Sequence, residues 1–202
     1  MSPPRAAWFI GLAIAVSLTG CAQTRLSHEP GLVTTWDRRP LLPADVPITL
    51  PLVLYTRYLE FDQPSDPSFE KWWSKYKVRH QLEDVIGEFP FLALASSDEV
   101  PTGDRVVVEA THAIRGNTFL NTVSQSTYCA IPSSSRGVIE LDARVYRTGQ
   151  PPTSYSAVGT YAIKRHVLLL ALPFVWGYKV PARTMEDTFR DLFLQIQRDL
   201  IQ

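Results

Sequence analysis

Two stretches of this chain largely alternate between apolar and polar residues, and they restrict the fold more than any other feature. In 104–114 the residues of one parity are mostly small and apolar, namely Val106, Val108, Ala110 and Ile114. In 137–149 one parity holds Ile139, Leu141, Ala143 and Val145. Successive side chains of a β-strand point to opposite faces, so each stretch predicts a strand with one buried and one solvated face.

Three further stretches read as strands. The stretch 50–61 is apolar on both parities, which favours an interior position in a sheet. A short apolar strand is predicted at 89–96, and another strand at 155–166. The residues 148–154, "TGQPPTS", separate the last strand from the stretch 137–149 and predict a hairpin turn.

Two helices are predicted, one in the middle of the domain and one at its end. Asp66 followed by Pro67 is typical of a helix start, and apolar residues recur at helical spacing over 68–86. Near the C-terminus, Thr184 is a candidate N-cap. The apolar stripe that follows consists of Met185, Phe189, Leu192, Phe193, Ile196 and Leu200.

The order β-α-β-β-β-β-α predicts an α/β (α+β) two-layer sandwich formed by residues 50–202 as one domain. We expect a mostly antiparallel sheet of about five strands, with both helices on one face. Two apolar insertions, near 115–136 and 167–180, do not belong to this framework. If the strands that start near 104, 137 and 155 form an antiparallel meander, both insertions leave the sheet at the same edge.

The N-terminus has the features of an export signal. A short basic stretch, 1–5, precedes the 13-residue apolar run 6–18, which is shorter than the roughly 20 residues that span a bilayer. The following "LTGC", 18–21, resembles the bacterial lipobox. The resemblance implies that residues 1–20 are a lipoprotein signal peptide and that Cys21 receives a diacylglyceryl group and a palmitate-type acyl chain. The alternative is an uncleaved N-terminal anchor with an incidental cysteine.

The residues after the lipobox bear on location. In such lipoproteins an Asp directly after the cysteine favours retention at the inner membrane. This chain has Ala22 there, so the resemblance implies that the protein is located at the periplasmic face of the outer membrane. Residues 21–49 are predicted to be a tether, because prolines interrupt them at positions 30, 40, 43 and 47. The chain holds only two cysteines, so a lipidated Cys21 leaves Cys129 without an intrachain partner.

No catalytic, metal-binding or cofactor-binding pattern is recognisable, so we predict a non-enzyme with no catalytic residue, no metal and no cofactor. The four histidines lack metal-ligand spacing, and His112 shares the inward parity of its strand. Glu140 and Asp142 share a strand face with Arg144, which predicts a charge-balanced surface. Lys plus Arg and Asp plus Glu each number 20, which argues against nucleic acid as a partner.

The stretch 167–176, "VLLLALPFVW", is uncharged and is broken by Pro173, so it is too short for a spanning helix. Three interpretations remain: it belongs to the core, it dips into the bilayer interface, or it docks a partner protein. The candidate membrane or partner contacts are Leu169, Leu170, Phe174, Trp176 and Tyr178.

The lipobox together with this order of elements resembles small bacterial envelope lipoproteins of the curli-secretion and penicillin-binding-protein-activator type, over about residues 50–202. The resemblance implies a membrane-anchored periplasmic lipoprotein that acts as a non-enzymatic accessory or assembly factor with an envelope protein as partner. The first alternative is a carrier that binds a lipid or other amphiphile through the two insertions. A weaker third alternative is an envelope hydrolase.

Overall fold

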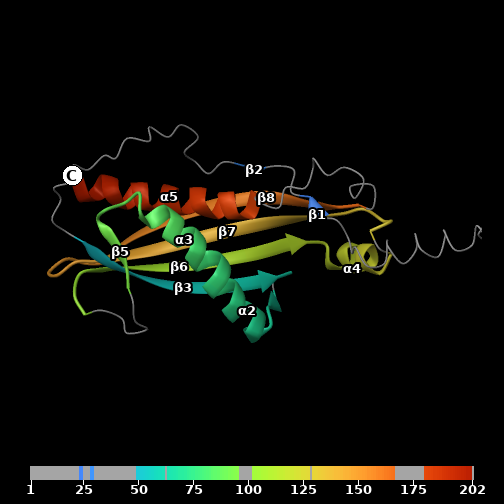
Figure 1. The fold of residues 1–202 in the computed structure, drawn as a ribbon, viewed down its shortest axis with the longest axis horizontal. Coiled ribbons are helices and arrows are strands. Elements are labelled where there is room, and N and C mark those ends of the chain that lie inside the picture. The colour runs from blue at the N-terminus through green and yellow to red at the C-terminus, as the bar shows by residue number, and fades with distance from the viewer. Residues whose placement is uncertain are drawn as a thin grey trace, which may run out of the picture.

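The computed structural model describes residues 23–24, 28–29, 49–61, 63–95, 102–127, 129–166 and 180–201. Helices cover a long twisted sheet (Figure 1). The main strands are β3 (Leu50–Glu60), β5 (Leu92–Leu94), β6 (Arg105–Gly116), β7 (Ser133–Tyr146) and β8 (Thr153–Arg165). Three two-residue strands complete the sheet: β1 (Gln23–Thr24), β2 (His28–Glu29) and β4 (Gln63–Pro64). The helices are α2 (Pro67–Trp73), η1 (Ser74–Val78), α3 (Arg79–Ile86), α4 (Thr118–Ser126) and α5 (Val180–Ile201).

The sheet has the strand order β1-β8-β7-β6-β3-β4, with β2 also on β8 and β5 also on β3. β6, β7 and β8 form the expected antiparallel meander. β3 pairs in parallel with β6 and β5, so the sheet is mixed. The other strand pairs of the sheet are antiparallel. The predicted α+β sandwich class is confirmed, and the five predicted strands correspond to the five main strands.

The core lies between one sheet face and the helices. The inward parity of β6 and β7 is buried as predicted, including Val108 and Leu141. Against it pack α3 and α5, whose fully buried side chains include Leu82, Phe189 and Leu192. The opposite parity keeps charged residues exposed to solvent. The alternation in the sequence therefore determines which sheet face the helices cover.

The central helix is continuous from α2 to α3, with the π-helical turn η1 between them. Its start is the predicted one, because the Asp66 carboxylate accepts hydrogen bonds from the backbone N–H of Ser68 (2.8 Å) and of Phe69 (3.3 Å). The C-terminal helix differs from the prediction at its start. α5 begins at Val180, and Thr184 is not its N-cap but donates its hydroxyl to the Val180 carbonyl at 2.7 Å. Proline is tolerated in a first helical turn, so Pro181 does not prevent this earlier start.

A segment outside the framework lies within 115–136, but it is shorter than predicted. β6 continues to Gly116 and β7 already begins at Ser133, so both strands are longer than predicted. Between them lies α4, a third helical segment placed beyond the strand ends rather than on the helix-covered face (Figure 1). The helix forms because the Asn117 side chain accepts the backbone N–H of Leu120 at 3.0 Å, which is an N-cap.

Several predictions lie outside the described residues. These are the signal peptide and all five candidate contacts of the C-terminal insertion, namely Leu169, Leu170, Phe174, Trp176 and Tyr178. Within the predicted tether, the two described pairs of residues are β1 and β2, and both pair with β8.

Candidate functional site

Four main strands have one end on the same side of the sheet, next to α4. We call this row of strand ends the α4 edge. β6 ends and β7 begins there, with Gly116 opposite Ser135, and β8 ends with Arg165 opposite Ser133. β3 runs parallel to β6 and ends there too, with Glu60 beside Ile114. The segment that contains α4 leaves from this edge, as predicted, and the chain enters 167–180 directly after β8. The α4 edge is the candidate functional site.

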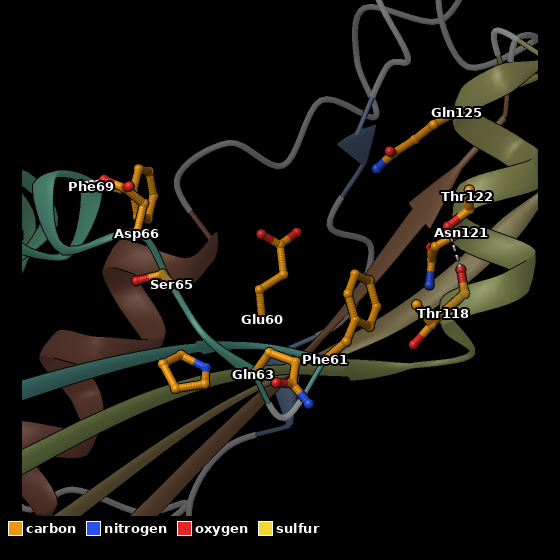
Figure 2. A pocket seen from close by; sticks show the side chains of 11 residues that line it. Glu60, Phe61, Gln63, Ser65, Asp66, Phe69, Thr118, Asn121, Thr122 and Gln125 are labelled. Carbon is orange, nitrogen blue, oxygen red and sulfur yellow. Dashed lines mark hydrogen bonds between the residues drawn. The ribbon is translucent and has the colours of Figure 1, made fainter.

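A groove of about 490 Å³ opens at the α4 edge between the end of β3 and α4. Figure 2 shows Glu60 and Phe61 on one side of it, with the side chains of Asn121 and Thr122 on the other. Its lining consists of Glu60, Phe61, Gln63, Pro64, Ser65, Asp66, Phe69, Thr118, Asn121, Thr122 and Gln125. Ligand sites in α/β proteins often lie outside the carboxyl ends of parallel strands, where β3 and β6 end here.

The lining of the groove is suited to hydrogen bonding. Most of its lining side chains carry hydroxyl, amide or carboxylate groups. The Asp66 carboxylate caps α2, and the N–H donors of Ser68 and Phe69 hold its pKa below the ordinary value. A carboxylate held in that charged form is a weak general base. The lining can therefore bind a polar group.

A buried polar cluster holds α4 against the strand ends. The Asn121 side-chain oxygen accepts hydrogen bonds from Arg165 Nη1 (2.7 Å) and from the Ser135 hydroxyl (3.1 Å). The Asn121 amide nitrogen donates to the Asn117 carbonyl at 2.9 Å. Asn121, Ser135 and Arg165 are each at most 5% exposed. These bonds connect α4 to both β7 and β8, so the helix has a fixed position at the edge.

Large apolar side chains at the α4 edge point to solvent. Phe119 is 72% exposed, Leu120 44% and Ile131, just after the helix, 42%. Neither Phe119 nor Leu120 lines the groove, to which α4 contributes Thr118, Asn121, Thr122 and Gln125 (Figure 2). No charged residue occurs between Gly116 and Ser135. Sequence reasoning missed these residues, although the absence of charge and the N-cap Asn117 were visible signals.

The N-terminal segment also reaches the α4 edge. β1 pairs antiparallel with the end of β8, with Gln23 opposite Arg165. Cys21 precedes Gln23 by two residues, and two residues of chain span at most about 7 Å. The chain length therefore keeps Cys21 close to this edge of the sheet.

Cys129 lies at the same edge, fully buried, and is disulfide-bonded. Cys129 is expected to lack an intrachain partner only if Cys21 is lipidated, so the disulfide leaves that conditional expectation untested. Cys21 is the only other cysteine of the chain. One sulfur cannot hold both a disulfide and a diacylglyceryl thioether, so an intrachain disulfide and lipidation of Cys21 are alternative forms.

The residues weighed for chemistry have structural contacts. His112 is buried, as predicted, and its Nε2 lies 2.6 Å from the Tyr161 hydroxyl. The rings of Tyr58 and Trp73 pack on the imidazole at 5.1 and 5.5 Å between centroids. Glu140 forms an ion pair with Arg115 (3.1 Å) on the solvated sheet face. Among the described residues, no group of three His, Cys, Asp or Glu could hold a metal ion.

The chain matches no known family model and no curated protein sequence. Within the described part of the chain, no helix combines the length and the apolar composition that crossing a membrane requires. The resemblance to envelope lipoproteins therefore stays a prediction based on the lipobox and the order of elements.

Proposed function

We propose that this protein is a lipoprotein of the periplasmic face of the outer membrane, where it acts as a non-enzymatic accessory or assembly factor of the cell envelope. The observation that carries the proposal is "LTGC" at 18–21, placed directly after an apolar run of signal-peptide length. Ala22 favours the outer membrane, as argued from the resemblance. An assembly role implies an envelope protein as partner.

The position of β1 is compatible with an anchor on Cys21 in the form in which Cys21 is not the disulfide partner of Cys129. Gln23 is hydrogen-bonded into the sheet opposite Arg165, so a lipid on Cys21 would project from the domain near the α4 edge. A thioether-linked diacylglycerol with a further acyl chain binds a bilayer stably, because membrane affinity grows by about 0.8 kcal/mol with each buried methylene group. The domain would then be held directly at the membrane surface.

The groove favours a binding role over catalysis and over an apolar cargo. A general acid–base pair would need two titratable groups with opposed pKa shifts, and the pKa of Asp66 at the groove is lowered, towards the charged form. A carrier for a lipid would need an enclosed apolar interior, whereas this groove is open and most of its lining residues carry polar side chains. The described residues thus favour the accessory role over the carrier and hydrolase alternatives.

The anchor is tested by expressing the full chain and its Cys21→Ser variant in a Gram-negative host. We expect the N-terminal peptide of the wild type to begin at Cys21 and to carry the mass of a diacylglyceryl group plus an acyl chain. The variant should lose this mass and leave the outer-membrane fraction. A wild-type chain that retains residues 1–20, or whose Cys21 carries no lipid, would show that the proposal is wrong.

A disulfide between Cys21 and Cys129, the alternative to lipidation of Cys21, is tested in the same preparations. The proposal requires the sulfur of Cys21 for the lipid, so Cys129→Ser should change neither the acylation nor the membrane fraction. Peptide mapping without reductant identifies the partner of Cys129. A peptide in which Cys21 and Cys129 are joined in the mature protein would exclude the lipid anchor.

The accessory role is tested by crosslinking in intact envelopes, followed by identification of the adducts. We expect one envelope protein to be recovered with the wild type and lost with the Cys21→Ser variant. Specific turnover of an envelope substrate by the purified full chain would instead support the hydrolase alternative.

A further inference from the structure

We propose that the α4 edge is a membrane-contact surface, in which Phe119, Leu120 and Ile131 lie in the interface of a phospholipid bilayer. This inference rests on the proposed lipid anchor and goes beyond it, because it states which surface of the domain faces the membrane.

The composition of the surface fits a bilayer interface. Phe119, Leu120 and Ile131 are the exposed large hydrophobic residues of a stretch that carries no charge from Gly116 to Ser135. Burying a charged side chain in lipid costs several kcal/mol, so an uncharged segment removes the main penalty for contact. Four polar residues of α4 line the groove, whereas the exposed Phe119 and Leu120 of the same helix do not.

The position of α4 is fixed by contacts within the domain, without a membrane. Asn121 holds α4 to Arg165 at 2.7 Å and to Ser135 at 3.1 Å, and all three residues are buried. The exposed side chains are therefore presented by a helix that is fixed to the ends of β7 and β8. A surface that is already ordered loses little conformational entropy when it meets the bilayer.

The proposed anchor indicates that this surface faces a bilayer rather than a protein partner. The register of β1 on β8 keeps Cys21 within about 7 Å of Gln23, at the same edge as α4. Acyl chains on Cys21 would enter the bilayer, and this short connection would bring the α4 edge close to the lipid. The uncharged sequence 167–178 also follows directly from the end of β8.

The rest of the described surface does not offer an equivalent face. Tyr55 (49% exposed) and Val158 (51% exposed) lie on the open sheet face, which also carries the exposed Arg57, Glu109 and Asp142. These charges make that face suited to water or to a protein partner. With the α4 edge on the bilayer, the strands run away from the membrane and the open sheet face remains accessible.

The test uses the full-length protein in native envelopes, with photoreactive benzoylphenylalanine in place of Phe119 or of Ile131. Matched controls carry the same group in place of Val158 or of Tyr55. After irradiation, mass spectrometry of the purified protein should show phospholipid adducts at 119 and 131 and none above background at 158 and 55. The substitution keeps an apolar side chain at an exposed position, so folding is not disturbed.

The outcomes separate this inference from the lipid anchor, since the N-terminal peptide is analysed in the same preparation. Lipid adducts at 119 support the membrane-contact surface, even if Cys21 proves to be unmodified. An acylated Cys21 without lipid adducts at 119 and 131 would overturn the surface and leave the anchor in place. Adducts of position 119 with a protein would overturn it as well and would make the α4 edge a partner-binding site.

Discussion

At the scale of single residues, Gly137 leaves the space in which the Tyr161 ring packs at one end of the core. Tyr161 lies across β7 at Gly137, where any β-carbon would collide with its ring. The Tyr161 hydroxyl lies 2.6 Å from Nε2 of His112, which fixes the ring in this place. The interior position of His112 therefore depends on a glycine that is 25 residues away in sequence.

Replacement of Gly137 by alanine should destabilise the domain. The new methyl group forces Tyr161 out of its place and disturbs its contact with His112, and overpacking of this kind costs about 1–3 kcal/mol. Gly87→Ala is the matched control, because a β-carbon there meets nothing within 4 Å. Urea denaturation of both variants measures the free energy of unfolding. Equal stabilities would show that Tyr161 has room to move.

Asp191 should make stability depend on pH. It is 5% exposed, its Oδ1 has no hydrogen-bond partner in the part of the chain that the structure describes, and burial together with Asp187 raises its pKa to about 6. The unfolded chain loses this proton near the ordinary pKa of 3.8, so between about pH 4 and 6 the folded state holds more protons. Stability therefore falls as pH rises through this window.

Asp191→Asn should accordingly be more stable than the wild type at pH 8, by up to about 2 kcal/mol, and no more stable at pH 4. Urea titrations at both pH values measure the difference, and Asp142→Asn, at an exposed position, controls for the change in net charge. A stabilisation that is the same at both pH values would contradict the assignment to Asp191.

At the scale of elements, α5 is connected to the end of α3 by one arginine. Arg190 donates to the Glu88 carboxylate at 2.9–3.2 Å and to the Asp187 carboxylate at 3.0 Å. Glu88 follows directly after α3, so the pair bridges two helices that are far apart in sequence. The ionic contact supplements the apolar contact between Phe89 and Phe193, whose ring centroids are 5.4 Å apart.

Arg190→Ala should lower the free energy of unfolding by about 0.5–1 kcal/mol, a modest effect because both carboxylates are partly exposed. The loss should shrink at high salt, which screens ion pairs. Arg79→Ala is the control, since its pairing with Glu83 (3.0 Å) joins two exposed side chains of one helix and should matter less. A larger loss for Arg79→Ala in thermal melts would refute the bridging role of Arg190.

At the scale of the whole molecule, β1 and β2 cover the outer edge of β8. Gln23 pairs with Arg165, and His28 pairs with Tyr161. An uncovered strand edge exposes backbone donors and acceptors that pair readily with a second chain. The N-terminal segment therefore protects the sheet as well as linking the domain to Cys21.

Deletion of residues 22–29 should lower the melting temperature and cause self-association through β8. Deletion of residues 31–38 removes an equal length and keeps both strands, so it serves as the control. Light scattering of the detergent-solubilised full-length variants measures their mass. If the two deletions behave alike, the pairing of β1 and β2 does not protect the edge.

Much of the framework could be predicted from the sequence, because local signals suffice for it. The alternation around Val108 and Leu141 assigned the buried sheet face, and Asp66 marked the helix start. The site was harder to predict. Arg165 looks like an ordinary polar strand end, and only its contact with Asn121, 44 residues earlier, shows that it is buried. The five candidate contacts in 167–180 remain predictions.

The sequence by itself determined the five main strands, the existence of the central and C-terminal helices, the face of the sheet that is buried and the lipobox that motivates the anchor, because each depends on side chains close together in the chain. Only the tertiary structure decided that β3 runs parallel to β6, that β1 pairs with β8 and that α4 sits at the shared strand ends. Strand pairing is made by backbone hydrogen bonds that are common to all residues, so it leaves little trace in the order of side chains.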